Sequence, residues 1–558
     1  MNTSKVLLII LLIIMPLLTI NVQSGKSQDS GVITILSNGD ISPSSMGVYI
    51  QKEGNVYTFL YDLPDASLIV QRSGIVIDGA GFALSGQGEA VSAIDVSFRS
   101  DVTIRNVVIN GIFYYGINIL GSTGITVINN TLLSNRFGIY IVNSTQNTIS
   151  ENNIVYNDVG LFLMSSSGNT FRNNNFDNQN NFAIFGNVLA DFVNDIDVSN
   201  TVVDKKTYYL INKKDLIITP DIYPDVGFLA LVGCTNITVQ NIELTSNGQG
   251  IILAYTTDST ILQNDITHNE NGILLFGSTN NVITGNSVTQ NGRGIQLSKS
   301  STGNDITANL IEENQNGILF FDSTTNTLVS NNITGSKIGI GFTSSSNNMI
   351  RGNFFINNTQ QVFDSGDDDS SIRLSVNYWD LDYPIGGNYW SDYPGFDLKS
   401  GTDQDQEGSD NIGDIPHIIN EANKDDYPKM LYGNPFVISI VSPENKTYGS
   451  SSVSVNYVVT ESDSISSYSL DGQANKTLIE SMTLSDLSYG SHELKVYARD
   501  TEGNESSDMV YFTISKEGDP SSGNGNIEDF PTMLVAVIIG IVALVGVVIL
   551  YFFRIKKK

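Results

Sequence analysis

Carboxylates at regular spacing mark one segment of the sequence as a candidate metal site. They belong to Asp403, Asp405, Glu407, Asp410 and Asp414. Acidic residues on alternate positions, followed by a glycine that permits a tight turn, resemble the first half of a calcium loop, where hard oxygen ligands converge on one ion. The segment differs from an EF-hand because glutamate stands at its fifth position and Asp414 at its twelfth. A calcium site and a solvated acidic turn therefore both stay open as interpretations.

A second group combines two carboxylates with a lysine and aromatic rings. Its members are Asp195, Asp197, Lys205, Tyr208 and Tyr209. Aromatic rings with a few polar groups are typical of sites that contact sugars and similar ligands. The group therefore predicts a carbohydrate-binding surface. The alternative is a β-hairpin that packs on the wall of the domain and carries ordinary surface charges.

Candidate catalytic acids are few in the middle of the chain. Glycoside hydrolysis needs two carboxyl groups that face one another across a substrate. The acids available there are Glu151, Asp258, Asp265, Glu270, Asp305, Glu312 and Glu313. Apart from the neighbours Glu312 and Glu313, no two of them occupy the same place in adjacent repeats. The sequence therefore assigns no catalytic residue, and an enzyme is the less favoured interpretation.

Charge and cysteine content exclude several classes of protein. The chain has 29 basic and 58 acidic residues, a net charge of −29, which repels phosphate backbones and argues against a nucleic-acid partner. The single cysteine, Cys234, excludes an intramolecular disulfide framework and a Cys-rich zinc site. A hydrophobic content of 40% is too high for a disordered chain. Backbone pairing and packing must therefore stabilise the fold.

An internal repeat organises the middle of the chain. Glycines recur in steps of 22 or 23 residues within two runs, at Gly116, Gly138 and Gly160 and then at Gly227, Gly250, Gly272, Gly294, Gly317 and Gly339. Apolar residues alternate in short bursts between them, each long enough for a strand and too short for a helix. A repeat of this length with three strands and three turns predicts a right-handed parallel β-helix, a pectin-lyase-like solenoid, over residues 31–360. The period breaks at 186–226, where we expect a lateral insertion.

Asparagines follow the same period. They stand fourteen residues after the glycine, or fifteen in the case of Asn309, at Asn130, Asn152, Asn174, Asn241, Asn264, Asn286, Asn309, Asn331 and Asn353. Stacked side-chain amides can hydrogen-bond from coil to coil, so the pattern predicts a structural ladder rather than a binding stripe.

Two further domains are predicted after the repeat. Residues 361–433 hold both tryptophans, Trp379 and Trp390, together with the acidic loop, and are expected to cap the open end of the β-helix. Residues 434–515 contain short alternating strands separated by turn signals, which predict a small immunoglobulin-like or fibronectin-like β-sandwich. Its Asn445, Asn475 and Asn504 begin Asn-x-Ser/Thr triplets and are the candidate glycosylation sites.

The two ends of the chain predict a surface location. Residues 1–24 have one lysine and then a long apolar run, as in a secretory signal peptide. Residues 516–530 form a linker, and 531–553 contain no charge and are long enough to span a bilayer as a helix. The basic tail at 554–558 is expected to stay in the cytoplasm. We therefore expect a single-pass protein of the cell membrane, with most of the chain outside.

Several motifs together resemble one family. The segments GIVIDGAGFALSG, DIDVSNTVVDKKTYYLIN and GGNYWSDYPGFD, with the repeated GIxLxxSxxNxIxxN, are similar to NosD-like right-handed β-helix proteins, also called carbohydrate-binding and sugar-hydrolysis repeat domains. The resemblance covers about residues 31–432. The added sandwich and basic-tailed anchor are similar to archaeal cell-surface members.

The resemblance also implies copper, because the family is associated with maturation of a copper enzyme. Copper sites need clusters of His, Cys or Met. This sequence has only His268, His417 and His492, far apart, with the one cysteine. Copper is therefore a doubtful cofactor, and calcium is the cofactor that the residues favour.

Together these features favour a non-catalytic cell-surface β-helix protein that binds or organises extracellular polysaccharide or serves as a structural component of the envelope. Its partners would be a glycan and, through one C-terminal helix, the membrane. A polysaccharide-active lyase, hydrolase or epimerase is the first alternative. A NosD-like accessory protein for copper-site maturation is the second.

Overall fold

A computed structural model describes residues 31–86, 91–368, 371–430, 438–443, 445–459, 465–478, 482–499 and 505–515. The chain divides into two compact units, Met1–Asn434 and Pro435–Lys558. The predicted signal peptide, linker, transmembrane helix and basic tail lie outside the described residues. Within the described ranges, no helix is both long and apolar enough to cross a membrane.

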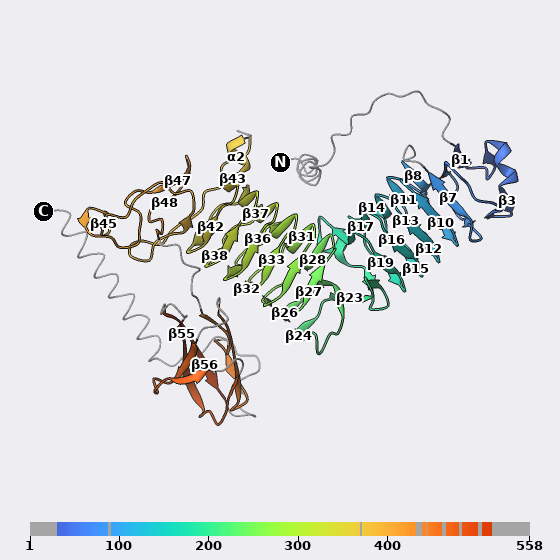
Figure 1. The fold of residues 1–558 in the computed structure, drawn as a ribbon. Coiled ribbons are helices and arrows are strands. Elements are labelled where there is room, and N and C mark those ends of the chain that lie inside the picture. Colours follow the sequence, from blue (N-terminus) through green and yellow to red (C-terminus); the bar gives the residue numbers. More distant parts are fainter. Residues whose placement is uncertain are drawn as a thin grey trace, which may run out of the picture. The chain divides into compact units, whose positions relative to one another are not determined.

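The first unit is an all-β parallel β-solenoid of the right-handed type, as the repeat predicted (Figure 1). The solenoid has two segments, and strands of the first segment, residues 31–196, form two sheets that the second segment does not share. Sheet 1 contains β2 (Ile41–Ser42), β1 (Gly31–Ile35), β5 (Ala66–Val70), β8 (Ser92–Asp95), β11 (Tyr115–Leu120), β14 (Phe137–Val142), β17 (Val159–Met164) and β20 (Asn180–Phe185), in that order. Sheet 2 contains β21 (Asp195–Ile196), β18 (Thr170–Arg172), β15 (Thr148–Ser150), β12 (Thr126–Ile128), β9 (Thr103–Arg105), β6 (Val76–Asp78), β4 (Val56–Phe59) and β3 (Ile50–Glu53).

Sheet 3 has 14 strands and runs through both segments of the solenoid. Its strands are β43 (Gln360–Asp364), β40 (Ile338–Thr343), β37 (Asn316–Phe321), β34 (Arg293–Ser298), β31 (Asn271–Phe276), β28 (Gln249–Ala254), β25 (Val226–Val232), β23 (Lys205–Ile211), β22 (Thr201–Val202), β19 (Asn175–Asp177), β16 (Asn153–Val155), β13 (Thr131–Leu133), β10 (Val108–Gly111) and β7 (Ala83–Gly86).

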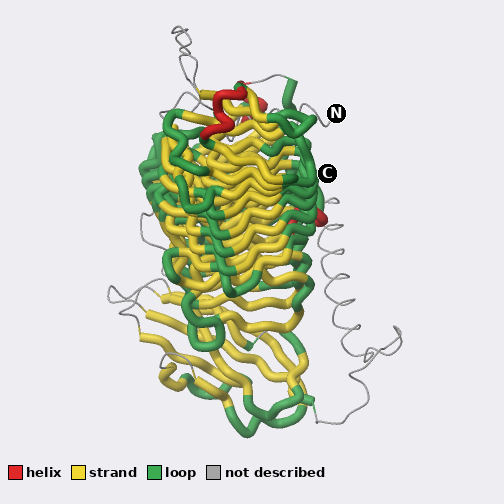
Figure 2. The backbone as a smooth tube through the Cα atoms, turned by 90° about the vertical axis from the view of Figure 1, so that its right-hand side faces the viewer, coloured by secondary structure: helices red, strands yellow, loops and turns green. Residues whose placement is uncertain are grey.

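The second segment completes its coils with two sheets of seven strands each. Sheet 4 contains β24 (Lys214–Ile218), β26 (Thr235–Gln240), β29 (Thr260–Leu262), β32 (Val282–Thr284), β35 (Asp305–Thr307), β38 (Thr327–Val329) and β41 (Met349–Arg351). Sheet 5 contains β27 (Glu243–Thr245), β30 (Asp265–Thr267), β33 (Ser287–Thr289), β36 (Leu310–Glu312), β39 (Asn332–Thr334), β42 (Phe354–Ile356) and β44 (Tyr389–Trp390). Figure 2 shows the strands of successive coils stacked on one another.

The repeat length sets the register of the stack. Ile117 pairs with Ile139, which pairs with Leu161, and all three side chains are fully buried in the core. The repeated glycine has a steric reason. A Cβ atom at Gly138 would lie 2.7 Å from the carbonyl oxygen of Gly160 in the next coil, so no side chain fits at this corner.

The asparagine ladder is confirmed in both segments. The Asn130 side chain donates to Asn152 Oδ1 at 3.0 Å, and the Asn286 side chain donates to Asn309 Oδ1 at 2.9 Å. Each ladder amide is buried and also bonds backbone groups, so it satisfies the polar atoms of the turns. Asn241 was wrongly predicted as a member: it is exposed, and the backbone N–H of Ile242 donates to Asn264 Oδ1 instead.

The segment 186–226 differs from the expected lateral insertion, because its strands pair within the sheets of the solenoid. It holds the short 3-10 helix η2 (Leu189–Phe192) and strands β21 to β24. β22 pairs antiparallel with β23, and β23 pairs parallel with β25, so sheet 3 continues across the break. Sheet 1 ends at β20, where the Phe182 carbonyl accepts from the N–H of Gly248 at 2.7 Å. The break therefore changes which sheets close the coils.

The segment after β43 covers the last coil, as predicted. Its elements are α2 (Ser365–Asp368), β45 (Lys399–Ser400), β46 (Gln406–Glu407), β47 (His417–Asn420) and β48 (Asn423–Asp425). Trp379 and Trp390 are each 2% exposed and belong to the core of the second segment. Trp390 stacks on Phe355 with ring centroids 4.4 Å apart. Both tryptophans therefore close the apolar column.

The second unit has two small sheets around one core. One contains β49 (Ile438–Ser442), β51 (Val453–Val459) and β54 (Met482–Leu484), and the other contains β50 (Thr447–Tyr448), β56 (Glu505–Ile514), β55 (Gly490–Arg499), β52 (Ile465–Leu470) and β53 (Lys476–Leu478). The assignment to an immunoglobulin-like or fibronectin-like family stays a prediction. Asn445 and Asn475 are exposed, and Asn504 lies outside the described residues.

Candidate functional site

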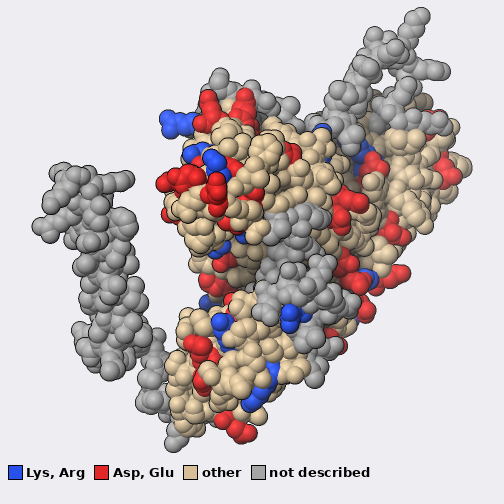
Figure 3. Space-filling view, turned by 60° about the vertical axis from the view of Figure 1, so that its left-hand side comes forward, with Lys and Arg blue, Asp and Glu red and all other residues tan. Residues whose placement is uncertain are grey.

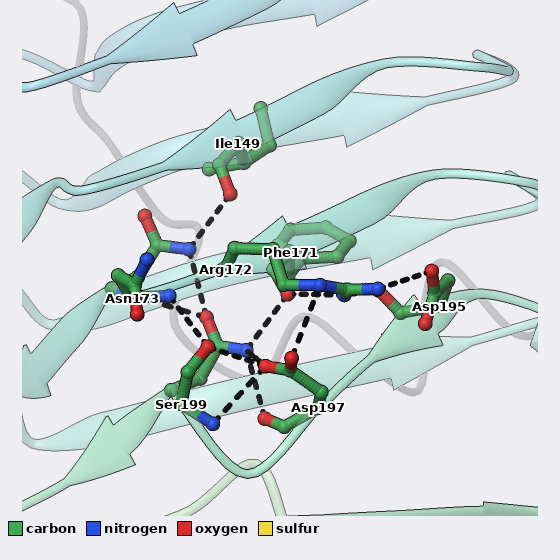
Figure 4. Close-up of polar contacts among 9 residues, drawn as sticks. Ile149, Phe171, Arg172, Asn173, Asp195, Asp197 and Ser199 are labelled. Atoms are coloured by element: carbon green, nitrogen blue, oxygen red, sulfur yellow. Dashed lines mark hydrogen bonds and ion pairs between the residues drawn. The ribbon is translucent and has the colours of Figure 1, made fainter.

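The predicted carboxylates Asp195 and Asp197 lie together, but they bind an arginine (Figure 4). Arg172, at the end of β18, forms an ion pair with Asp195, and its Nε lies 3.1 Å from Asp197 Oδ2. Arg172 Nη1 also donates to the carbonyls of Phe171 and Asp195 at 2.7 and 2.8 Å. Ser199 donates to Asp197 through its hydroxyl and, at 3.0 Å, through its N–H. These groups satisfy one another and tie two coils together.

The two tyrosines of the same predicted group are structural. Tyr208 and Tyr209 are each 8% exposed. Their hydroxyls donate to the carbonyls of Pro224 and Phe192 at 2.9 and 2.6 Å. Lys205 is exposed at the start of β23. Because buried rings cannot stack on a sugar, the five residues do not form one binding surface.

The acidic loop closes on itself through backbone hydrogen bonds. Asp410 Oδ2 accepts from the N–H of Gly401 at 3.2 Å, and Asp414 Oδ1 accepts from the N–H of Leu398 at 3.1 Å. The other three carboxylates, on Asp403, Asp405 and Glu407, are exposed. Within the described ranges, no three His, Cys, Asp or Glu side chains are grouped so that they could hold a metal ion.

One oxygen in this loop still lacks a donor. Gln404 is 8% exposed, and its Oε1 has no hydrogen-bond partner among the described residues. Calcium therefore stays a prediction that the described carboxylates do not support.

The calcium prediction is tested by thermal melting with and without a chelator. It is supported if the chelator lowers the melting temperature and this difference disappears in the Asp403→Asn, Asp405→Asn variant. It is excluded if the chelator leaves the melting curve unchanged.

The residues that copper would need are also separate. His417 stacks on Trp390 at 4.6 Å, and His492 in the second unit bonds Asp471 at 2.8 Å. Cys234 is buried, and its Sγ donates to the Leu210 carbonyl at 3.3 Å. These side chains do not fit a copper site.

Six aromatic side chains lie together on the outer face of sheet 1, and we call them the aromatic surface. They are Tyr114, Tyr115, Phe137, Tyr140, Phe162 and Phe185. All are half-buried, and none belongs to the core of the solenoid. Five stand on β11, β14, β17 and β20, where core residues such as Ile139 and Ile141 point inward between them.

The rings of the aromatic surface form a continuous row across four coils. Tyr115 and Tyr140 have ring centroids 4.3 Å apart. Tyr140 stacks on Phe162 at 5.0 Å with an angle of 9°, and Phe162 contacts Phe185 at 5.4 Å. Tyr140 and Phe162 are partners in the register of β14 and β17, so the coil spacing itself stacks the rings.

Polar groups border the row. Asn118 precedes Tyr140 in the same stack and is 8% exposed. Its Nδ2 donates to Ser97 Oγ at 3.1 Å and to Asp95 Oδ2 at 3.3 Å, but its Oδ1 has no partner among the described residues. On the other side, the Arg136 guanidinium lies 4.8 Å from the centre of the Tyr114 ring. The row of rings is therefore bordered by an amide and a guanidinium.

Burial raises the pKa of Tyr115 and of Tyr140 above their usual value. Both side chains are therefore neutral phenols at physiological pH, and each hydroxyl can donate and accept a hydrogen bond. Such groups suit a ligand that offers hydroxyls.

The aromatic surface was missed by the sequence analysis, although a signal for it exists. Aromatic residues stand directly before the repeated glycine at Tyr115 and Phe137, and two positions after it at Tyr140 and Phe162. Beyond this surface, acidic side chains are spread over the face drawn in Figure 3, with Lys and Arg in fewer places.

The fold defines a parallel β-solenoid protein with an exposed row of aromatic rings. Residues 20–209 and 192–395 match the family described as Periplasmic copper-binding protein (NosD). Because the match covers more than half of the chain, the protein belongs to this family, which confirms the resemblance of its motifs. No curated protein shows significant similarity to the chain.

Solved structures show only distant similarity. The A-module of mannuronan C-5 epimerase from Azotobacter vinelandii is 14% identical, with 56% of this chain and 87% of that chain covered and a TM-score of 0.23. DFA-IIIase from Arthrobacter chlorophenolicus is 11% identical, with 58% of this chain and 85% of that chain covered and a TM-score of 0.22. The periplasmic alginate epimerase AlgG is 12% identical, with 57% of this chain and 80% of that chain covered and a TM-score of 0.21. Similarities this low carry no argument about function.

Proposed function

We propose that this protein is a non-catalytic cell-surface protein that binds or organises extracellular polysaccharide through the aromatic surface of sheet 1. The observation that carries the proposal is the row of half-buried rings across four coils. Exposed contiguous apolar patches rimmed by polar groups mark binding sites. Sugars offer C–H groups for the rings and hydroxyls for the polar rim.

The proposed membrane attachment depends on the sequence alone. The apolar residues 531–553 and the basic tail that follows support an anchor with the solenoid outside the cell. In that position the solenoid would meet polysaccharide directly. If the protein binds no specific glycan, we propose that it serves instead as a structural component of the envelope.

Glycan binding is tested with the purified full-length chain on an array of neutral and acidic polysaccharides. We expect Tyr140→Ala and Phe162→Ala to weaken binding at least about tenfold, because each removes a ring from the row. Phe396→Ala is the control, since Phe396 is an exposed ring at 67% in the segment that covers the last coil. Unchanged binding by both variants, or no bound glycan at all, contradicts the proposal.

A polysaccharide-active enzyme is the second candidate, and one arrangement favours it. On sheet 3, Arg293 Nη1 lies 2.9 Å from Glu270 Oε1 and 3.3 Å from Asn271 Oδ1. The Arg293 side chain is only 7% exposed, whereas that of Glu270 is 47% exposed. Such a held carboxylate could contact a sugar. New reducing ends or unsaturated products in the binding samples, lost in Glu270→Gln, would establish the enzyme and replace our first proposal.

A further inference from the structure

Two cationic residues, Arg351 and Lys429, lie where the last coil joins the segment that covers it. Arg351 ends β41, and Lys429 follows β48 by a few residues. The N–H of Gly352 donates to the Gly387 carbonyl at 2.9 Å, which joins the two backbones beside Arg351. A Cβ atom at Gly386 would lie 3.6 Å from Lys429 Cε. The two cations therefore project from adjoining segments.

Arg351 has no acceptor among the described residues. Its Nε is buried and makes no hydrogen bond there, and its guanidinium forms no ion pair with a described carboxylate. Arg105 and Arg293 pair with carboxylates, at 2.8 Å from Asp78 and 2.9 Å from Glu270, and Arg99 donates to the Val70 carbonyl instead. Arg351 differs from these arginines because its buried Nε has no acceptor among the described residues, and a buried donor without an acceptor is unfavourable.

The backbone of Lys429 is paired within the segment that covers the last coil. Its N–H donates to the Asn388 carbonyl at 2.8 Å, and it forms β-bridges with Tyr389 and Ile412. Burial, and then the positive charge of Arg351, lower the pKa of Lys429. Two like charges held close together in a half-buried place repel one another, so a negative group between them would be stabilised.

The negative charge of Asp425 raises the pKa of Lys429, but burial and Arg351 outweigh it, so the pKa stays lowered. Asp425 Oδ2 accepts from the N–H of Asn388 at 2.7 Å and from Trp390 Nε1 at 2.9 Å. Its Oδ1 accepts from the N–H of Tyr427 at 3.2 Å. Asp425 forms no ion pair with Lys429 among the described residues, since its oxygens serve the backbone and the indole.

We propose that Arg351 and Lys429 form a binding site for an oxyanion: a sulfate, phosphate or carboxylate group. A planar guanidinium and a neighbouring ammonium are the usual partners of such groups. The site lies at the end of the solenoid and uses no residue of the aromatic surface, so it does not depend on the proposed function. The net charge of −29 repels anions at long range, so binding is expected to be short-ranged and to weaken as salt rises.

The test is calorimetric titration of the full-length chain at constant ionic strength with sodium sulfate, sodium phosphate and oligogalacturonate, with neutral galactose as the negative control. We expect Arg351→Gln and Lys429→Gln each to weaken anion binding at least about tenfold. Lys337→Gln removes the same charge from an exposed position and should change affinity less than about twofold. Equal binding by all three variants, or no anion binding by the unmodified chain, overturns the proposal.

Two further comparisons separate the possible outcomes. Tighter binding of oligogalacturonate than of the free ions identifies the acid group of a polysaccharide as the ligand, and the reverse identifies a free inorganic ion. If Arg351→Gln does not fold, Arg351→Lys is used instead. It keeps the positive charge but lacks the paired N–H donors of the guanidinium, so weaker binding by this variant still supports the site. Neutral-glycan binding by the aromatic surface should be unchanged in every variant, so the failure of one proposal leaves the other testable.

Discussion

At the scale of the residue, Asp425 takes the place of an asparagine in the amide ladder. The N–H of Asn353 donates to Asn388 Oδ1 at 3.0 Å, and the N–H of Asn388 donates to Asp425 Oδ2 at 2.7 Å. Burial is the main cause that raises the pKa of Asp425 from 3.8 to about 7. Between these values the folded chain holds a proton that the unfolded chain releases. This group therefore stabilises the fold at low pH, and that contribution is lost as the pH rises through about 7.

The first prediction follows from this linkage. Asp425→Asn should keep the hydrogen bonds of the ladder and remove the loss of unfolding free energy between about pH 4 and about pH 7. Urea unfolding at several pH values measures it, with the exposed Asp177→Asn as the control. Burial lowers the pKa of His417, which acts in the opposite direction by destabilising the fold as the pH falls. The comparison is therefore between variants, and parallel pH profiles would contradict the prediction.

The second prediction concerns the ladder itself. Asn286 Oδ1 accepts from both the N–H and the side chain of Asn264, and Asn286 Nδ2 donates to the Ile261 carbonyl at 2.9 Å. Asn286→Ala leaves these buried groups without partners and should lower the unfolding free energy by about 2–4 kcal/mol. Asn316→Ala, at a half-buried asparagine on β37, should cost under about 0.5 kcal/mol. Chemical denaturation measures both, and equal costs would show that the ladder is not stabilising.

At the scale of the element, the segment after β43 closes the core by stacking. Trp390 lies between the rings of Phe355 and His417, with centroids 4.4 and 4.6 Å away. Trp379 contacts the Phe342 ring at 5.9 Å, and its Nε1 donates to Asn423 Oδ1 at 3.0 Å. The same segment thus extends both the apolar column and the polar ladder past the last coil.

The third prediction is that loss of a stacked ring from this cover destabilises the solenoid. Trp390→Ala should lower the unfolding free energy of the solenoid by about 3–5 kcal/mol, because it creates a cavity and leaves Asp425 with one donor fewer. Tyr378→Ala, at an exposed tyrosine of the same segment, should change it little. Thermal unfolding followed by circular dichroism compares the two. A similar small effect of both variants would mean that the last coil is stable without its cover.

At the scale of the whole molecule, the chain has two compact units with separate cores. The core of the second unit includes Phe512, which is 1% exposed, and Val496. None of the core residues described for this unit belongs to the core of the solenoid. We therefore expect each unit to unfold cooperatively and independently of the other.

The fourth prediction is that scanning calorimetry of the full-length chain resolves two unfolding transitions. Trp390→Ala should lower the temperature of only one, and Phe512→Ala should lower only the other, because each removes a ring from a different core. One transition that shifts as a whole in both variants would show that the two units unfold together.

The elements that depend on local periodicity could be predicted from the sequence. The spacing of Gly138 and its equivalents gave the coil length, the amides gave the ladder, and Trp379 and Trp390 gave the cover of the last coil. These features could be predicted because a solenoid stacks each repeat on its neighbour, so positions one period apart must meet. Asn241 shows the limit of this rule, since it lies in the coil next to the break in the repeat and is displaced from the ladder.

The sequence did not show which side chains lie outside and which lie together, because long-range packing places them. This packing buried Tyr208 and Tyr209, joined Arg172 to the two predicted carboxylates, and assembled the aromatic surface from four coils. It also brought together the two segments that carry Arg351 and Lys429. The physical reason is that the period specifies the contacts along the stack, whereas exposure and contacts between distant segments depend on how the non-repeating segments, 186–226 and the cover of the last coil, pack against it.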